Sequence, residues 1–179
     1  MKRARNFLSL SLIVVAVLCV TVAFLYKKTA GKPAGQPLIL TPAVINHPLP
    51  EADLVNISGM RLGDNRLRHG KVVLVFTLTT CKPCDQENEF LRTVINTRND
   101  ISFFYVIPMG IKTEALKEAR DKYCLETFFD QGSILAKKLE VYQVPIKVFL
   151  EDGIIKKTWV EATVTDQRRS EFQNWLKEL

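Results

Sequence analysis

The stretch Lys71-Val72-Val73-Leu74-Val75-Phe76-Thr77 leads, within a few residues, into Thr80-Cys81-Lys82-Pro83-Cys84, and these two segments decide the fold. A continuous apolar run rich in β-branched residues is typical of a central strand covered on both faces. After the second cysteine, apolar residues recur at three- and four-residue spacing, at Phe90, Leu91, Val94 and Ile95. This spacing predicts an amphipathic helix. The sequence therefore predicts a strand, a short loop, a Cys-X-X-Cys pair and a helix in succession.

A Cys-X-X-Cys pair at the start of a helix favours thiol-disulfide chemistry. Cys81 is expected at the helix N-terminus, where free amide donors and the positive end of the helix dipole stabilise a thiolate. Cys84 is expected one turn inside the helix, close enough to attack a mixed disulfide formed on Cys81. We therefore predict both cysteines as catalytic residues. Their own redox-active disulfide replaces a cofactor, and no metal is expected.

The rest of the folded region predicts alternating strands and helices. Strands are expected at 101–107 and 146–150, and the second is paired with 154–159 through a turn that contains Asp152-Gly153. Further expected elements are short strands around turns within 54–67, a polar helix over 112–123, a short strand over 127–129, a short helix over 133–139 capped by Ser133, and an amphipathic helix over 166–179.

The formal charge of +6 does not indicate nucleic-acid binding. Six positive residues lie in the first 32 positions, and the remaining 19 basic residues equal the 19 acidic ones. A region without net positive charge or a basic stripe lacks the electrostatic footprint that phosphate-backbone binding requires. Nucleic acid is therefore excluded as a partner.

The basic N-terminal region predicts a membrane anchor followed by a tether. From Phe7 to Tyr26 only Ser9, Ser11 and Thr21 are clearly polar, and an apolar run of this length spans a bilayer as a helix. The best cleavage site falls inside this run, so an uncleaved anchor is favoured over a cleaved signal peptide. The expected division is a short cytoplasmic segment 1–6, an anchor 7–26, a proline-rich tether 27–50 and a folded domain 51–179.

The predicted order of elements resembles the thioredoxin fold, and its details resemble the membrane-anchored TlpA/ResA-like thiol-disulfide oxidoreductases. The resemblance covers about 52–179 and rests on Gly70 to Phe76 before the cysteine pair, on Val144-Pro145 before the hairpin, and on Glu87. The expected fold class is α/β and thioredoxin-like, with a central mixed sheet flanked by helices. An N-terminal strand extension, an inserted helix and strand, and one preceding transmembrane helix complete that expectation.

Glu87 is the carboxylate that the pattern singles out as a catalytic residue. It follows Cys84 by three residues and shares a helix face with Leu91, so its side chain is expected to point to the core, unlike that of Glu89. A buried carboxyl there can exchange a proton with the resolving thiol. The resemblance implies the same role, because a glutamate at this spacing lies beneath the cysteine pair in ResA-like proteins.

The resemblance further implies an extracytoplasmic enzyme that exchanges disulfides with protein substrates. Pro145, in cis, is expected to present the preceding backbone to the partner chain. Pro83 within the loop is typical of reducing members, so we expect reduction of envelope proteins such as apocytochrome c, with electrons from a membrane thiol donor. The expected location is the inner membrane, as a single-pass protein whose domain faces the periplasm or the cell exterior. Thr80 and Ile146 depart from the Trp and Thr usual in the family, and both are expected to flank the partner surface.

Other chemistries remain as alternatives or are excluded. A structural zinc site needs four ligands, and the sequence has no second Cys-X-X-Cys or Cys-X-X-His. A peroxiredoxin needs Thr or Ser where Leu78 stands. A copper-binding metallochaperone on the same fold needs a histidine downstream of the pair, whereas His47 and His69 precede it. The copper protein stays an alternative, as does a disulfide-forming oxidase that uses the same site in reverse.

Two further residues need an interpretation. Cys124 is expected to be a buried small side chain and not a third redox thiol. Lys147 lies in an apolar strand two residues after Pro145. It either reaches the sheet edge or pairs with a carboxylate, and the pattern leaves both possibilities open.

Overall fold

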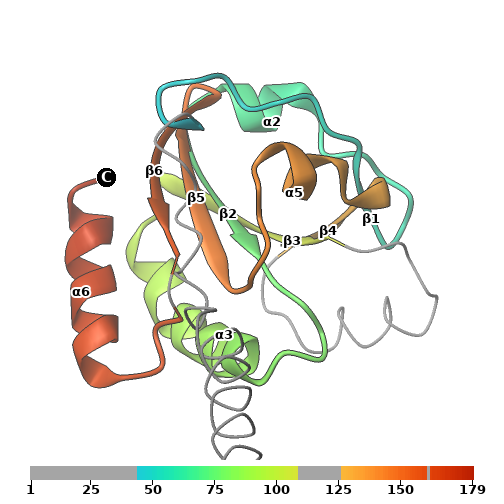
Figure 1. Cartoon of the computed structure of the whole chain (residues 1–179). Helices are drawn as coiled ribbons and strands as arrows, with labels where there is room; N and C mark the ends of the chain where they lie inside the picture. The colour runs from blue at the N-terminus through green and yellow to red at the C-terminus, as the bar shows by residue number, and fades with distance from the viewer. Residues whose placement is uncertain (1–43, 109–125, 161) are drawn as a thin grey trace, which may run out of the picture. The chain divides into compact units, whose positions relative to one another are not determined.

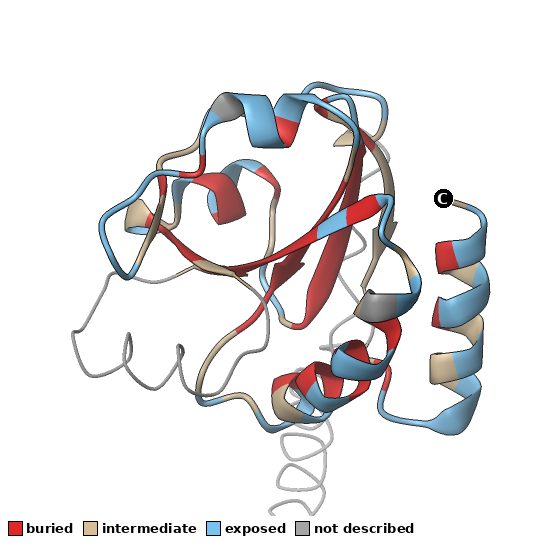
Figure 2. Cartoon of the chain, turned by 180° about the vertical axis from the view of Figure 1, so that it is seen from behind, coloured by how far each residue is buried: buried red, intermediate tan, exposed pale blue. Residues whose placement is uncertain are grey.

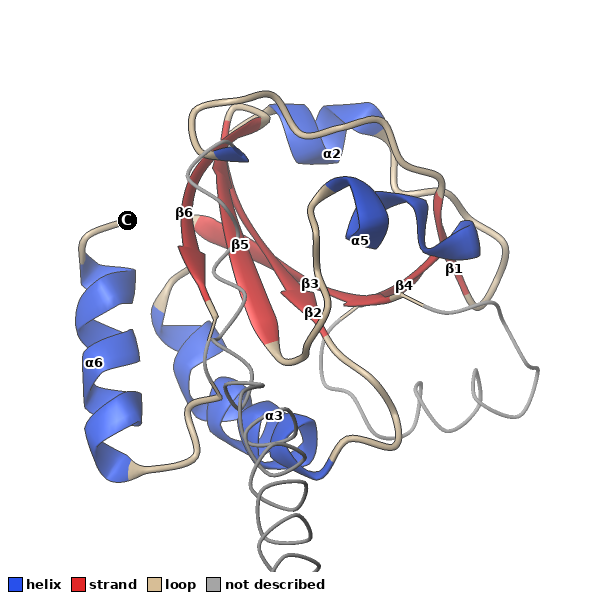
Figure 3. Ribbon diagram, viewed as in Figure 1, coloured by secondary structure: helices blue, strands red, loops and turns tan. Residues whose placement is uncertain are grey.

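The computed structural model describes residues 44–108, 126–160 and 162–179, which build a six-stranded mixed sheet with helices on both faces (Figure 1, Figure 3). The strands are β1 (Leu54–Asn56), β2 (Lys71–Phe76), β3 (Ile101–Ile107), β4 (Thr127–Asp130), β5 (Ile146–Glu151) and β6 (Ile154–Trp159). The helices are α2 (Asp64–Arg68), α3 (Lys82–Val94), α5 (Ile134–Lys138) and α6 (Asp166–Lys177), with 3-10 turns η2 (Ile95–Thr97) and η3 (Gln131–Ser133). The strand order is β1-β4-β3-β2-β5-β6.

The apolar run Lys71–Phe76 forms a central strand of the sheet, β2. β2 pairs in parallel with β3 and antiparallel with β5, so both of its edges are hydrogen-bonded. Its residues Val73 to Phe76 are 0% exposed. Figure 2 shows the buried residues gathered on these strands and on the inner sides of the helices. Burial on both faces explains why this strand reads as a continuous apolar run without alternation.

Alternate side chains of each central strand enter two separate cores. Leu74 and Phe76 of β2 pack in one core with Leu67 of α2 and with Leu135 and Leu139 at α5. The other core holds, among other residues, Val73 and Val75 of β2, Phe90, Leu91 and Val94 of α3, and Phe172 and Leu176 of α6. The fold is therefore an α/β arrangement of three layers, and the helix that follows the redox loop covers the same sheet face as the C-terminal helix.

Aromatic rings fix α6 on that face. The Phe172 ring lies 5.4 Å from the Trp159 ring and 6.1 Å from the Phe90 ring, both in edge-to-face geometry, which aromatic pairs favour. Trp175 lies 6.5 Å from Phe149 of β5. These contacts join α6 to α3, β5 and β6.

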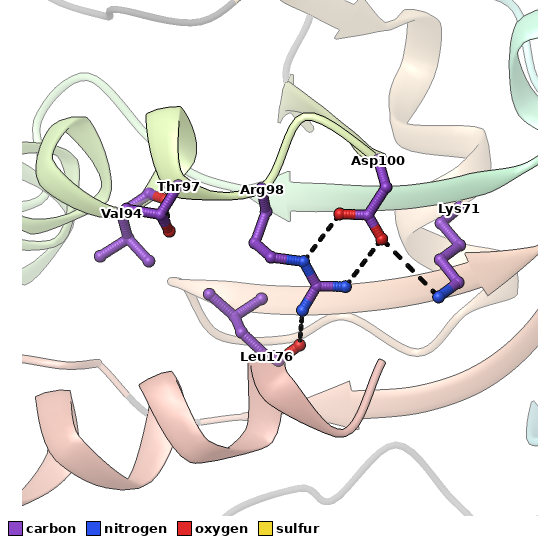
Figure 4. Close-up of polar contacts among 6 residues, drawn as sticks. All are labelled: Lys71, Val94, Thr97, Arg98, Asp100 and Leu176. Atoms are coloured by element: carbon purple, nitrogen blue, oxygen red, sulfur yellow. Dashed lines mark hydrogen bonds and ion pairs between the residues drawn. The ribbon is translucent and has the colours of Figure 1, made fainter.

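A polar network in the segment between η2 and β3 contacts the C-terminal end of α6 (Figure 4). The Arg98 guanidinium donates to both Asp100 carboxylate oxygens, at 2.8 and 2.9 Å, and to the carbonyl oxygen of Leu176. Lys71 Nζ lies 3.7 Å from the same carboxylate. Cations near a helix C-terminus interact favourably with its dipole, so Arg98 links the start of β3 to the end of α6.

Most predicted elements occur where the sequence places them, and the β5–β6 hairpin is confirmed. Its turn residues Asp152 and Gly153 have φ values of 50° and 77°, in the left-handed region that such two-residue turns require. The expectation of only short strands around turns within 54–67 is wrong in part, because residues 64–68 form α2. That helix is short, and its buried Leu67 joins the core, so tertiary packing decides its conformation.

The predicted side-chain cap of Ser133 is also wrong. Ser133 lies at the N-cap of α5 with a φ of 56°, and its Oγ donates to the Pro108 carbonyl at 2.8 Å. The cap comes from Asp130, which is fully buried and whose carboxylate accepts from the Leu135 and Ala136 amides at 3.0 and 2.7 Å. A carboxylate fills this role better than a hydroxyl because hydrogen bonds to an ionised acceptor are stronger.

The segment before β1 lies against the hairpin. Asn46 and Leu49 donate backbone hydrogen bonds to the carbonyls of Ile155 and Gly153, and Leu49 is buried. This end of the predicted tether thus contacts the edge of β6. The predicted anchor, the helix expected over 112–123 and Cys124 lie outside the described residues. Among the described ranges, no helix has the length and apolar character needed to cross a bilayer.

Candidate active site

The Cys-X-X-Cys pair forms a disulfide at the first turn of α3. Cys81 is the N-cap of this helix, and its Sγ accepts a hydrogen bond from the Cys84 amide at 3.2 Å. Cys81 is half-buried, whereas Cys84 is 1% exposed. An N-terminal amide aimed at the sulfur stabilises negative charge there, and the difference in exposure makes Cys81 the sulfur that a partner can reach.

The loop that precedes β5 lies beside Cys81. The Val144–Pro145 peptide bond is cis, as the resemblance implied. The Val144 carbonyl oxygen lies 3.9 Å from Cys81 Sγ. The Cys81 amide itself donates to the Leu78 carbonyl at 3.3 Å, which fixes the loop after β2. Segments that are 63 residues apart in the sequence therefore meet at the reactive sulfur.

A hollow of about 260 Å³ lies next to this meeting point. It shares Leu78 and Val144 with the surroundings of Cys81, and Val141, Tyr142 and Pro108 are among its other apolar lining residues. Tyr142 is 65% exposed, which is unusual for a large aromatic side chain. The surface beside the disulfide is thus mainly apolar.

Glu87 points into the protein, as its position on the helix predicted. Its side chain is 1% exposed, and its Oε1 lies 2.7 Å from Nζ of Lys147, which is 0% exposed. Glu87 Oε2 accepts a hydrogen bond from the Thr163 amide at 2.6 Å. The sequence left the partner of Lys147 open, and the structure gives it as Glu87. The two residues form a fully buried ion pair one helical turn below Cys84.

Burial sets the electrostatics of this pair. Desolvation lowers the pKa of Lys147 to about 8, and the nearby Glu87 carboxylate opposes that shift. The Lys147 ammonium also lies 5.1 Å from the centre of the Phe172 ring, a favourable cation–π distance. A buried charge needs such partners because an isolated ion in the interior changes its protonation state instead.

The expectations for Ile146 and Thr80 have different outcomes. Thr80 is exposed beside Cys81, and its place at a partner surface stays a prediction. Ile146 is 0% exposed and packs in the core on the other side of the sheet, so the expectation that it flanks the partner surface is wrong. The reason is strand alternation: Lys147 faces α3 and α6, and its neighbour must then face the opposite layer.

One further polar group in this layer was missed by the sequence reasoning. Asn88 is 4% exposed and its Oδ1 accepts from the Tyr105 hydroxyl at 2.8 Å. Tyr105 reads as an ordinary apolar position in a buried strand, so only its need for a hydroxyl partner could have signalled the contact. As for metal ligands, no group of three His, Cys, Asp or Glu side chains placed to hold an ion occurs in the described part of the chain.

Solved structures share this arrangement of elements. The chain is similar to a secreted Mycobacterium tuberculosis disulfide oxidoreductase homologous to E. coli DsbE, with 18% identity, a TM-score of 0.60 and coverage of 71% of this chain and 95% of that one. The fold is thioredoxin-like. The thioredoxin domain of a Bacteroides vulgatus thiol-disulfide oxidoreductase is 14% identical, with a TM-score of 0.59 over 73% of this chain and 96% of that domain.

A third similar structure is an uncharacterized thioredoxin-like protein from Porphyromonas gingivalis, 21% identical, with a TM-score of 0.59 and coverage of 73% of this chain and 90% of that one. No protein-family model and no curated protein matches the chain. At these identities the likeness shows the fold alone.

Proposed function

We propose that this chain is a thiol-disulfide oxidoreductase that reduces disulfides in partner proteins through Cys81 and Cys84. The observation that carries the proposal is the disulfide at the N-terminus of α3, with a reachable Cys81 and a buried Cys84. A helix N-terminus stabilises the Cys81 thiolate that nucleophilic attack requires. The similar structures whose names include disulfide oxidoreductase activity support the same class of reaction.

The reaction proceeds in two exchanges. The Cys81 thiolate attacks one sulfur of a partner disulfide, forms a mixed disulfide and releases the other partner sulfur as a thiolate. Cys84 then loses its proton and attacks Cys81 Sγ, so that the Cys81–Cys84 bond forms and the bond to the partner breaks. Two electrons pass to the partner, and Glu87, one turn from Cys84, accepts the Cys84 proton. The apolar surface with Tyr142 suits partner segments that carry apolar side chains beside their cysteine.

Direction and location complete the proposal. Pro83 in the redox loop favours a reducing pair over an oxidising one, because a histidine there would stabilise the reduced form and make an oxidant. The apolar run 7–26 favours attachment to the inner membrane with the domain outside the cytoplasm. In that compartment the electrons come from a membrane thiol donor, and apocytochrome c or another maturation substrate takes them.

Trapping of the mixed disulfide tests the function. In a Cys84→Ser variant the partner stays bound to Cys81, because no resolving thiol remains. Cells that express this variant should yield a thiol-cleavable adduct, and the matched Cys81→Ser variant should yield none. Adducts that form equally with both variants would contradict the assigned roles.

A redox titration tests the direction. The Cys81–Cys84 pair should equilibrate with glutathione at a potential nearer about −270 mV, as in thioredoxin, than about −120 mV, as in DsbA. A potential above about −170 mV would refute reduction and favour the disulfide-forming oxidase.

A further inference from the structure

The proposed reaction gives a role to Glu87 but none to Lys147, the other member of the buried ion pair below Cys84. Glu87 comes from α3 and Lys147 comes from β5, where it stands in register with Val75 of β2 and Trp159 of β6. Both side chains lie in the layer between the sheet, α3 and α6, with 1% and 0% exposure. Lys147 also follows Pro145 by two residues on the strand that begins at the partner-facing loop.

Each oxygen of the carboxyl contacts a different donor. Oε1 lies 2.7 Å from the Lys147 ammonium, and Oε2 accepts from the Thr163 amide at 2.6 Å. The carboxyl group therefore has a positive charge beside one oxygen and a hydrogen-bond donor at the other. Without the ammonium, the carboxylate at this depth would lose the ionic contact that balances its charge.

We propose that Lys147 is a positioning residue for proton transfer at Cys84: its ammonium keeps Glu87 ionised as the base and balances the buried charge after the proton has moved. Before transfer the three groups are a neutral thiol, a carboxylate and an ammonium, with net charge zero. After transfer they are a thiolate, a neutral carboxyl and the same ammonium, again with net charge zero. This inference rests on the proposed disulfide exchange.

The step balances in atoms and electrons. The proton leaves Cys84 Sγ for Glu87, and the electron pair left on that sulfur forms the bond to Cys81 Sγ. The bond between Cys81 and the partner sulfur breaks, and the partner departs as a thiolate that takes the proton back through Glu87. Lys147 is charged throughout and exchanges no proton in this step.

Other ionisable groups lie on the elements that pack around the pair. Cys84 and the half-buried Asp85 lie on α3 itself, and Tyr105 faces the layer from β3 and donates to Asn88. From α6, Arg169 donates through Nε to the Thr163 carbonyl at 3.2 Å, so it touches the segment that caps Glu87. Because Lys147 forms an ionic contact of 2.7 Å with Glu87, a change at Lys147 should dominate the response to pH.

The resolving step can be timed alone with one equivalent of the aromatic disulfide dithiobis(nitrobenzoate) and the reduced full chain. Attack by Cys81 releases a first nitrothiobenzoate, and attack by Cys84 releases the second. In Lys147→Met the second release should slow by about a hundredfold at pH 7, the order of a lost general base. The rate of the second release should also depend on pH differently in the variant and in the parent. The rate of the first release should have the same pH profile in both.

Matched variants separate a positioning role from a structural one. Glu87→Gln should slow the second release by a similar factor, and Lys147→Met combined with Glu87→Gln should slow it no further, because Lys147 acts through Glu87. Lys147→Arg, which retains the charge, should restore most of the rate. Lys156→Met, the same substitution in β6, should match the parent. A second release in Lys147→Met that superimposes on the parent at every pH, or losses that multiply in the double variant, would overturn the inference.

A measurement on the unaltered chain covers the case in which Lys147→Met does not fold. The ¹⁵N signal of the Lys147 side chain, followed across pH in the oxidised and reduced protein, should titrate at different midpoints in the two redox states. Identical titration curves would overturn the inference. If the parent shows no second release at all, the proposed function fails; if it does and only the Lys147 results disagree, the inference fails alone.

Discussion

Removal of the Lys147 charge should destabilise the protein in a way that depends on pH. The ammonium is 0% exposed and lies 2.7 Å from a carboxylate that is 1% exposed, so both charges are shielded from bulk solvent. Breaking a buried ion pair from one side costs about 3–5 kcal/mol, because it leaves an uncompensated charge. Lys147→Met should lower the free energy of unfolding of the oxidised chain by that amount at pH 7, and Glu87→Gln should cost a comparable amount.

The double variant decides whether the cost comes from the pair. Gln at position 87 can still accept the Thr163 amide, and Met at 147 fills most of the lysine volume, so the combined variant removes both charges at once. We expect its cost to be close to that of either single variant, and so the coupling free energy should be about 2 kcal/mol or more. Urea denaturation at pH 7 measures all four proteins. Costs that add to within about 0.5 kcal/mol would refute the ion-pair reasoning.

The pH dependence gives a second check on the same variant. Lys147→Met removes the titration of Lys147, so the slope that this group gives the parent between about pH 8 and pH 10.5 should be absent from the variant. In the parent, burial lowers the pKa of Lys147 to about 8. The unfolded chain therefore binds more protons above that pH, and the desolvation cost of Lys147, complete below about pH 8, should fade as the pH rises toward 10.5. Lys156→Met serves as the control and should keep the parent slope.

Three other outcomes follow from the same structure. Cys81 should be alkylated by iodoacetamide faster than Cys84 in the reduced protein, with a rate at neutral pH above that of a free thiol of pKa about 8.5, because the helix N-terminus stabilises its thiolate; faster alkylation of Cys84 would reverse the assigned roles. Asp130→Ala should lower the free energy of unfolding by about 2–4 kcal/mol, since two amides at the start of α5 lose a charged acceptor, and the exposed Asp166→Ala should change it little in the same urea titration. Hydrogen bonds from Arg98 lower the pKa of Asp100 to about 2, so its contribution to stability is complete above about pH 4 and is lost as the pH falls toward 2; the Tm difference between the parent and Asp100→Asn should therefore shrink over that range, and a constant difference would contradict the contact.

The parts of the fold that the sequence predicts are those where local signals agree. The apolar run at β2, the Asp-Gly turn and the spacing after Cys84 each specify one conformation, and all three occur as expected. The region around α2 failed because Gly63-Asp64-Asn65 carries turn signals. Only the burial of Leu67 against the sheet makes a helix of those residues, and that contact joins segments whose proximity no local pattern reports.

The cap of α5 shows a similar limit at the level of one side chain. Ser133 is in the position that a capping rule favours, but its left-handed backbone directs the hydroxyl to Pro108 at the end of β3. The cap falls to Asp130 because β4 ends directly before the turn and its last carboxylate meets the free amides. Sequence spacing gives the candidates for a cap, whereas the chain path between strand and helix selects among them.

The Glu87–Lys147 pair shows what the sequence can and cannot predict about a buried charge. It can indicate that Lys147 is unusual, but it cannot identify the residue that Lys147 contacts. A lysine inside an apolar strand either reaches the sheet edge or pairs with a carboxylate, since lysine is almost never fully buried unpaired. Strand alternation cannot say which face it takes, because Ile146, Lys147, Val148 and Phe149 are all buried. The partner becomes identifiable only once α3 is known to cover the face of Phe149: Glu87 then is the acidic residue that the helix turns inward, one turn from Cys84. The sequence of β5 thus raises the question of a partner for Lys147, and the position of α3 answers it. Because the pair lies one helical turn from the resolving cysteine, the charge of Lys147 should affect the disulfide exchange.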